Sequence, residues 1–271
     1  MYFEMFSLLI FSKTDKMTTA IHERMVNVKN WKIYMYLIIT YITMHVGSVF
    51  LTIPLIQYFN GDISLSEQEV AYSATAWSLF STNLVAAIIF IALILSNKKF
   101  SHVFKGKPSS IGNTILWGFI GFFLAMFGQL LAAFIETKLG VEAGSANTEL
   151  LSDIARISPI IIISMVIFAP LLEEIIFRRV LFGGLYRKTN FIIAALISAV
   201  VFAAVHGELH HLLIYMAPAL VFSYIYYRTK RLLAPMLAHL LMNGFVVIVQ
   251  LNYEKLEEFQ KMNQAFFFLF H

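Results

Sequence analysis

The 271-residue sequence contains no cysteine, which excludes disulfide bonds, thiolate catalysis and zinc sites with cysteine ligands. Charged residues are scarce as well, because Asp, Glu, Lys and Arg make up only 13% of the chain, against about 25% in soluble domains. Hydrophobic residues reach 59%, where a soluble domain carries about 45–50%, and the mean hydropathy is +0.75. This composition excludes a soluble globular enzyme, a disordered protein and a nucleic-acid-binding protein, and it predicts an integral membrane protein.

Long apolar runs fill most of the chain. A helix needs roughly 20 mostly apolar residues to cross the hydrocarbon core of a bilayer. Seven segments meet this requirement, at about 35–59, 76–96, 111–135, 158–182, 190–207, 211–227 and 232–252. Because the runs are continuously apolar rather than alternating, they predict helices and not barrel strands. We therefore expect an all-α fold, a polytopic membrane helical bundle with about seven spans.

No internal repeat or linker divides these spans, so the chain is treated as one bundle with an N-terminal arm. We divide it into a cytoplasmic arm (1–30), N-terminal membrane helices (31–150), a C-terminal helical core (151–252) and a polar and aromatic tail (253–271). The apolar run in the arm is too short to span and has no basic region before it, so it is a poor signal peptide. Met17 and Met25 are alternative start positions.

Basic residues are concentrated on one side of the predicted membrane. With the N-terminus inside, 16 of the 20 Lys and Arg residues fall in the cytoplasmic arm and loops, as the positive-inside rule requires. Arg178 and Arg179 are included in that count, with Arg178 alternatively inside the bundle. The outer side keeps Lys138, Arg156, Lys255 and Lys261. The pattern predicts a multi-pass protein of the cell membrane with its N-terminus inside and its C-terminus outside.

Ionisable and polar side chains nevertheless interrupt three of the predicted spans. Such a side chain costs at least about 2.5 kcal/mol at the centre of a membrane, so its presence suggests a function. The C-terminal spans carry Glu173, Glu174, Arg178, Arg179, His206, His239 and Asn243. The first three spans carry only His45 as a comparable residue, and we expect His45 to be structural. His210 and His211 are expected to be solvated near the outer interface.

Helical spacing sorts these side chains. Glu174 and Arg178 are four residues apart on one face, with the acid N-terminal to the base, as a helical ion pair prefers. Glu173 points about 100° away from Glu174, so that pair does not use it. Pro170 lies one turn earlier and is expected to kink the helix beside Glu173.

The remaining pairs are also four residues apart. Phe202 and His206 share one face of the fifth span, and His239 and Asn243 share one face of the seventh. Their depths, at about 1.5 Å per residue, agree with that of Glu173 to within one or two helical turns. The pattern predicts that these side chains converge on one buried polar chamber.

The available chemistry is limited by what the spans lack. They contain no plausible Ser–His dyad and no Asp pair, and the HExxH motif of zinc proteases is absent from the chain. The remaining polar side chains include no nucleophile, which favours water as the nucleophile. We expect Glu173 and His206 to hold and deprotonate a water molecule, and His239 and Asn243 to stabilise the oxyanion that forms. Burial is expected to improve Glu173 as a base.

A metal site is the alternative chemistry. Glu173, His206 and His239 form a possible set of one carboxylate and two imidazoles. His206 and His210 are also four residues apart, if the helix continues through them. Water activation without a metal or other cofactor is the favoured interpretation.

Three motifs resemble those of a known family. EEIIFR (Glu173 to Arg178), FAAVH (Phe202 to His206) and HLLMN (His239 to Asn243) look like the motifs of the CAAX-protease and bacteriocin-processing (CPBP, or Abi) family, which includes the Ras-converting CAAX endopeptidase. They occur in the family's order, on separate predicted helices, over roughly 165–250. The resemblance implies an intramembrane glutamic endopeptidase whose catalytic core is 151–252.

The same resemblance implies roles for the motif residues. Glu173 and His206 would act on the water, and His239 and Asn243 on the oxyanion, with Glu174, Arg178 and Phe202 in support. The expected partners are the lipid bilayer and a membrane-associated or hydrophobic peptide or protein, and not nucleic acid. Two alternatives stay open at this point. In a peptide-binding or bacteriocin-immunity protein, the chamber would bind a peptide without cutting it. In a transporter, the same side chains would relay protons, although no inverted repeat supports this function.

Overall fold

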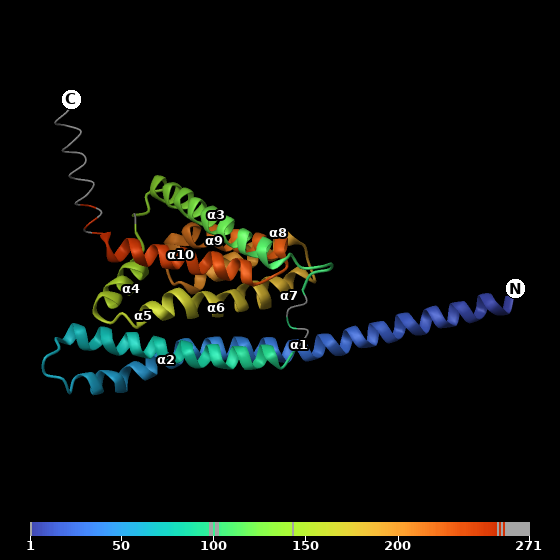
Figure 1. The fold of residues 1–271 in the computed structure, drawn as a ribbon, viewed down its shortest axis with the longest axis horizontal. Helices are drawn as coiled ribbons and strands as arrows, with labels where there is room; N and C mark the ends of the chain where they lie inside the picture. Colours follow the sequence, from blue (N-terminus) through green and yellow to red (C-terminus); the bar gives the residue numbers. More distant parts are fainter. Residues whose placement is uncertain are drawn as a thin grey trace, which may run out of the picture.

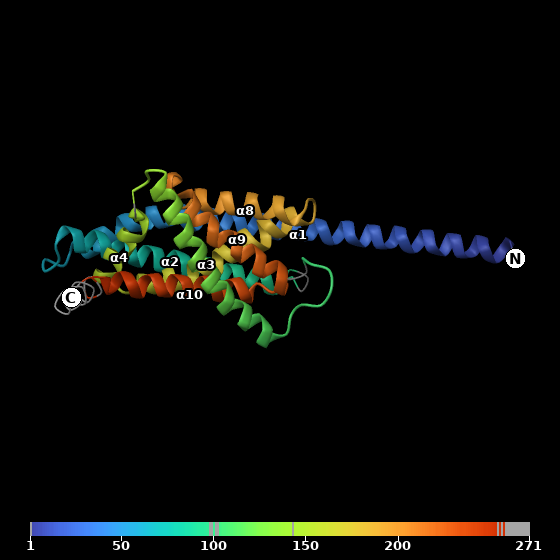
Figure 2. The ribbon, with the colours of Figure 1, turned by 90° about the horizontal axis from the view of Figure 1, so that it is seen from above.

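The computed structural model describes residues 2–97, 100, 103–142, 144–253, 255 and 257, with the backbone alone over 2–30, and its regular secondary structure there is helical (Figure 1). No strand occurs in these residues, which confirms the all-helical prediction. Most of the predicted tail over 253–271 lies outside the described residues. The N-terminal part of the first helix, α1 (Tyr2–Phe59), extends beyond the bundle in both views (Figures 1 and 2).

Among the described residues, five helices are long and apolar enough to cross a membrane. They are Trp31–Phe59 of α1, α2 (Glu67–Leu95), α3 (Ile111–Lys138), Leu209–Thr229, which comprises a 3₁₀ turn (Leu209–His211) and α9 (Leu212–Thr229), and α10 (Leu233–Leu251). The predicted fifth span corresponds to a shorter helix, α8 (Phe191–Val205). The number of spans and the direction of the N-terminus therefore remain predictions.

The predicted fourth span is not one regular helix. It consists of α5 (Ile161–Ile163), the π-helical segment η1 (Ser164–Phe168), α6 (Ala169–Glu173), a second π-helical segment η2 (Glu174–Phe182) and α7 (Gly183–Tyr186). Pro170 lies at the start of α6. Because proline has no backbone N–H, it cannot donate a hydrogen bond to the preceding turn. Each π-helical turn changes which side chains share a face, and such segments are frequent at functional sites.

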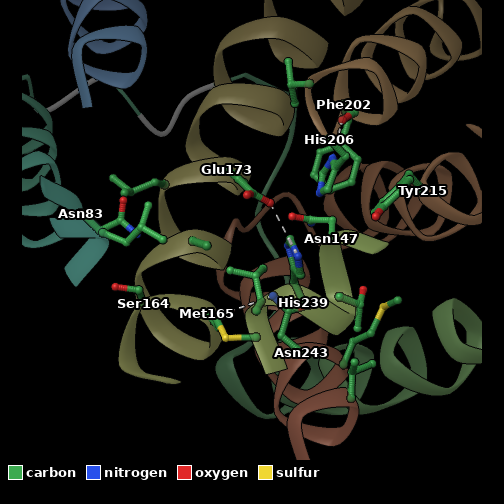
Figure 3. A pocket seen from close by; sticks show the side chains of 18 of the residues that line it. Asn83, Asn147, Ser164, Met165, Glu173, Phe202, His206, Tyr215, His239 and Asn243 are labelled. Atoms are coloured by element: carbon green, nitrogen blue, oxygen red, sulfur yellow. Dashed lines mark hydrogen bonds and ion pairs between the residues drawn. The ribbon is translucent and has the colours of Figure 1, made fainter. Parts of the chain in front are cut away.

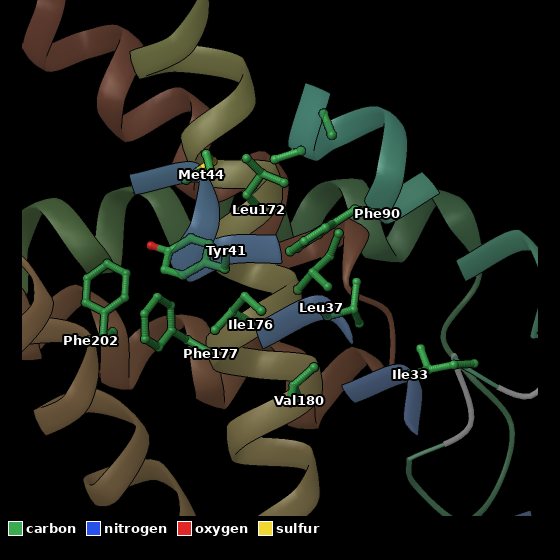
Figure 4. Packing of buried hydrophobic residues seen from close by; sticks show 14 of the residues in the cluster. Ile33, Leu37, Tyr41, Met44, Phe90, Leu172, Ile176, Phe177, Val180 and Phe202 are labelled. Atoms are coloured by element: carbon green, nitrogen blue, oxygen red, sulfur yellow. The ribbon is translucent and has the colours of Figure 1, made fainter. Parts of the chain in front are cut away.

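The helices pack as two groups that meet along this interrupted helix. The α1–α2 pair lies on one side, while α3, α8, α9 and α10 form the other (Figures 1 and 2). The main apolar cluster joins the two groups through side chains of α1, α2, η2 and α8, as Figure 4 shows for Tyr41, Phe90, Ile176, Phe177 and Phe202. Many large apolar side chains outside this cluster are exposed, including Phe50, Phe123, Phe127, Ile192 and Ile248, as expected where lipid is the solvent.

Arg178 and Arg179 are both fully buried. The placement of Arg179 in a cytoplasmic loop is therefore wrong, and for Arg178 the alternative position inside the bundle is the correct one. Arg179 donates to the carbonyl of Phe100 and to the hydroxyl of Tyr34, and its guanidinium lies over both rings. The physical reason is that η2 and α7 continue the helix through 174–186 and pack both arginines inside the bundle. Fourteen basic residues then remain on the predicted cytoplasmic side, against four on the outer side.

The crossing of α3 with α9 and α10 depends on a glycine. A Cβ atom at Gly121 would lie 2.5 Å from Ile225 Cδ1 and 3.1 Å from Ala238 Cβ. Ile225 and Ala238 are fully buried, so neither side chain has solvent or lipid to move into. The small residue lets the three helix backbones approach closely, as is common in membrane bundles.

We therefore expect Gly121→Leu to destabilise the fold by about 1–3 kcal/mol, the usual penalty for overpacking. Thermal unfolding in detergent measures this loss. Gly112→Leu is the matched control, because it lies in the same helix and a Cβ atom there meets nothing within 4 Å. Equal stability of the two variants would contradict this packing at the crossing.

Candidate active site

The polar side chains predicted from the sequence surround one cavity. It has a volume of about 420 Å³ and lies between the α1–α2 pair and the C-terminal helices (Figure 3). Glu173, His206, His239 and Asn243 all line it, so the structure brings together the four residues predicted to be catalytic. Each comes from a different turn or helix, namely the end of α6, the end of α8 and two successive turns of α10.

His239 lies between two carboxylates. Its Nδ1 is 2.9 Å from Glu174 Oε1, and its Nε2 is 3.7 Å from Glu173 Oε2. The imidazole stacks on Phe222, with ring centroids 4.9 Å apart and an interplanar angle of 25°. Because an ionised carboxylate only accepts hydrogen bonds, Nδ1 is the donor to Glu174. This contact fixes the ring and directs Nε2 towards the cavity.

The two neighbouring glutamates have different environments. The Glu174 side chain is fully buried, whereas that of Glu173 is 15% exposed and faces the cavity. Glu174 also forms the predicted ion pair, with Arg178 Nε 3.2 Å from its Oε2. The sequence did not predict that Glu174 would bond to His239 as well. The π-helical geometry of η2 begins at Glu174 and accompanies this use of both carboxylates by one histidine.

Arg178 is enclosed by aromatic rings and main chain. Its guanidinium lies 4.6 Å from the centroid of Phe202 and 5.2 Å from that of Phe222, and Nη2 lies 3.4 Å from the carbonyl oxygen of Ala219. Cation–π contacts are strongest in a desolvated environment such as this one. The predicted supporting residues Glu174, Arg178 and Phe202 thus form one contiguous layer beneath the cavity.

His206 is held at the end of α8. Its Nδ1 lies 2.8 Å from the carbonyl oxygen of Phe202. Since a carbonyl only accepts, Nδ1 carries the proton and Nε2 keeps its lone pair. The ring stacks on Tyr215 with centroids 4.2 Å apart. A neutral imidazole with a free Nε2 can accept a proton or hold a water molecule.

The structure does not support His210 as a partner of His206. The helix α8 ends at Val205, and Gly207 has a φ of +79°, so the two histidines do not share a helical face. More generally, no three His, Asp or Glu side chains of the described residues are grouped closely enough to hold a metal ion, and this includes the set Glu173, His206 and His239.

Asn243 lies one turn after His239 on α10. Its Nδ2 donates to the main-chain carbonyl of Met165 in η1 at 2.8 Å. An amide NH₂ has two donor hydrogens, so the second one is available to a molecule in the cavity. The bond to η1 fixes the orientation of this amide.

A further polar network, around Glu208, was not predicted from the sequence. Glu208 accepts hydrogen bonds from Tyr215 Oη (2.6 Å), Ser145 Oγ (2.7 Å) and the main-chain N–H of Asn147 (3.2 Å). Burial raises the pKa of Glu208, but these hydrogen bonds and one from the N–H of Ala146 outweigh that effect and hold its pKa below the ordinary value. The network connects the ring beside His206 to the start of a short helix, α4 (Ala146–Ile157).

Helix α4 covers part of the cavity. Asn147, Thr148 and Leu151 contribute to the cavity lining. At the other end of the helix, Arg156 donates to the carbonyl of Gln250 at 2.8 Å. The segment lies between two predicted spans, and only the Ser145 cap and the acidic first turn were local signals of a helix there.

The structure also places the other histidines. His45 lines the cavity beside Tyr41, and its structural role stays a prediction. The expectation that His211 is solvated was wrong. His211 is buried, with Nδ1 3.0 Å from Glu136 Oε2. Glu136 in turn accepts from the main-chain N–H of Leu213 at 2.7 Å, which ties α3 to the start of α9. His210 is exposed, as expected.

Comparison with known proteins identifies related sequences. The family model described as type II CAAX prenyl endopeptidase Rce1-like matches residues 155–245. The chain is 41% identical over 223 residues to the putative membrane peptidase YdiL of Bacillus subtilis, covering 82% of this chain and 90% of YdiL. It is 34% identical over 227 residues to the membrane-embedded CAAX protease MroQ of Staphylococcus aureus, covering 81% of this chain and 87% of MroQ. No solved structure matches the chain.

The matched region contains all three sequence motifs, and the two relatives share most of their length with this chain. The chain therefore belongs to the CAAX protease family of membrane-embedded peptidases.

Proposed function

We propose that this protein is an intramembrane endopeptidase that hydrolyses a peptide bond of a membrane-associated or hydrophobic peptide, using water activated by Glu173 and His206. The observation that carries the proposal is the difference between the two adjacent glutamates. Glu174 is fully buried and occupied by Arg178 and His239, whereas Glu173 faces the cavity. A carboxylate that faces a cavity and is not consumed by an ion pair with Arg or Lys is suited to act as a base.

The proposed reaction uses only side chains of the cavity. The carboxylate of Glu173 removes one proton from a water molecule that also donates to Nε2 of His206. The water oxygen then adds to the peptide carbonyl carbon. Glu173 passes its proton to the amine nitrogen as the C–N bond breaks, which leaves a carboxylic acid on one product, with the second water proton still on its oxygen, and a free amine on the other.

The oxyanion of the tetrahedral intermediate is assigned to His239 and Asn243. The second amide hydrogen of Asn243 and the Nε2–H of His239 supply the donors. Because Nδ1 of His239 already donates to Glu174, this role requires His239 to be the imidazolium, with a proton on both nitrogens. Glu174 and Met165 hold these two side chains in place before the substrate arrives. Donors fixed in advance stabilise developing charge without further reorganisation.

The class of substrate follows from the surroundings of the cavity. Apolar side chains such as Met44, Leu79, Leu151 and Val246 make up much of the lining, and the helices around it expose apolar surface. A hydrophobic peptide, a leader or signalling peptide, or a protein C-terminus at the membrane fits these surroundings.

Replacing Glu173 by glutamine is expected to lower kcat by about 100-fold or more, since general-base catalysis contributes roughly 10²–10⁴-fold. The amide keeps the size of the side chain but cannot take the proton. Cleavage of a hydrophobic peptide library by protein in detergent, followed by mass spectrometry, measures the effect. Glu149→Gln, on the exposed face of α4, is the control. Full activity of Glu173→Gln would exclude Glu173 as the base, whereas a wild type that cleaves no peptide would leave a peptide-binding or immunity role.

Asn243→Ala is expected to reduce kcat by about 10²–10³-fold without abolishing cleavage, the usual effect of losing one oxyanion donor. The KM should change little, because the donor acts mainly on the transition state. Steady-state kinetics with one cleaved peptide separate the two constants. A rise in KM at unchanged kcat would instead show that Asn243 binds the ground state.

A further inference from the structure

Two buried polar side chains lie in the cavity away from the reacting groups. Ser164 of η1 is 3% exposed and Asn83 of α2 is 8% exposed, and both contribute to the lining. Figure 3 shows them together on one side of the pocket, with His206 and Tyr215 on the other. The segments that carry them, α2 and η1, are packed against each other.

Neither side chain is satisfied within the part of the chain that the structure describes. Ser164 Oγ is buried without a hydrogen-bond partner, and the Asn83 amide forms no hydrogen bond there. Other buried hydroxyls in the bundle are paired: Ser78 donates to the carbonyl of Ser48 at 2.6 Å, and Ser198 to that of Phe177 at 2.8 Å. Buried polar groups are normally paired in this way, so the unpaired Ser164 hydroxyl needs an explanation. The Asn83 amide borders the cavity beside it.

These groups match the hydrogen-bonding pattern of a peptide unit. An asparagine amide can donate to the carbonyl and accept from the N–H of the same peptide bond, and a serine hydroxyl can do either. The neighbouring residue along the chain, Met165, holds Asn243 through its carbonyl. A peptide laid along η1 would therefore meet the oxyanion donors and the two unpaired side chains in succession.

We propose that Asn83 and Ser164 form a subsite that binds the main chain of the substrate peptide beside the scissile bond. The inference rests on the proposed function, because it names how the peptide of that reaction is held. Recognition through the main chain leaves side-chain preference to the apolar part of the cavity. Asn83 and Ser164 are binding residues in this account and take no part in the proton transfers.

The test uses binding rather than cleavage, with full-length Glu173→Gln protein in detergent. The probe is a short hydrophobic peptide selected from a library for binding to this variant. A series of analogues replaces each backbone N–H of that peptide by an ester oxygen, one position at a time. One analogue should bind about tenfold more weakly than the parent, as expected for the loss of one hydrogen bond.

Adding Asn83→Leu should weaken binding of the parent peptide by about tenfold and remove the penalty of that ester, since the two changes delete the same bond. Ser164→Ala should also weaken binding several-fold, yet leave the melting temperature unchanged or higher, because it removes a hydroxyl that has no partner. Ser78→Ala is the control: its hydroxyl is equally buried but bonds within the protein, so it should lower the melting temperature without affecting binding.

Unchanged binding in Ser164→Ala, together with an ester penalty that persists in Asn83→Leu, would overturn the subsite. Ser164→Ala alone decides the matter if Asn83→Leu does not fold. Binding that depends on these residues in a protein whose wild type cuts nothing would refute the peptidase and keep the subsite. If cleavage requires Glu173 but peptide binding is unaffected by substitution of Asn83 and Ser164, only the subsite is refuted.

Discussion

The buried contact of Glu174 with Arg178 and His239 is the interaction on which the rest of the site depends. Removing a charged pair from water costs free energy, which only contacts within the bundle can offset. Here the guanidinium lies over Phe202 and Phe222, and the carboxylate contacts both the arginine and the histidine. This arrangement links η2, α8, α9 and α10 at one point. Loss of Glu174 or of Arg178 would leave the charge of the other uncompensated in the bundle.

The same contact gives the adjacent residues Glu173 and Glu174 different roles. Because Glu174 takes the structural contacts, Glu173 is left facing the cavity, where a base is useful. The helix changes from α to π between Glu173 and Glu174, and the directions of the two side chains depend on this change. Segments of this kind cost some hydrogen-bond quality and are found mostly where function requires a particular side-chain direction. The site therefore uses an irregular helix to give two identical side chains different environments.

Much of this could be predicted from helical spacing alone. The i, i+4 relation of Glu174 and Arg178 gave the ion pair, and the depths of Glu173, His206 and Asn243 correctly placed them around one chamber. Such predictions succeed because an apolar run in a membrane has few alternatives to a helix. The roles of these residues in a reaction remain predictions from their geometry and family.

The remaining features depend on contacts between segments far apart in the chain. Arg179 was placed in a loop because its partners, Tyr34 and Phe100, are many residues away. His211 and its partner Glu136 are also far apart in sequence, and so are Glu208 and the start of α4 that it binds. No local pattern indicates either of them. The two π-helical segments were also missed, since hydropathy does not distinguish them from regular helix.

The central claim is that a water molecule held by Glu173 attacks the peptide directly. Single-turnover cleavage in H₂¹⁸O, followed by mass spectrometry of both product and protein, tests it. Direct attack places one ¹⁸O in the new carboxylate of the product and none in the protein. Label in the side chain of Glu173 would show that the carboxylate itself attacked the carbonyl, and would contradict this account.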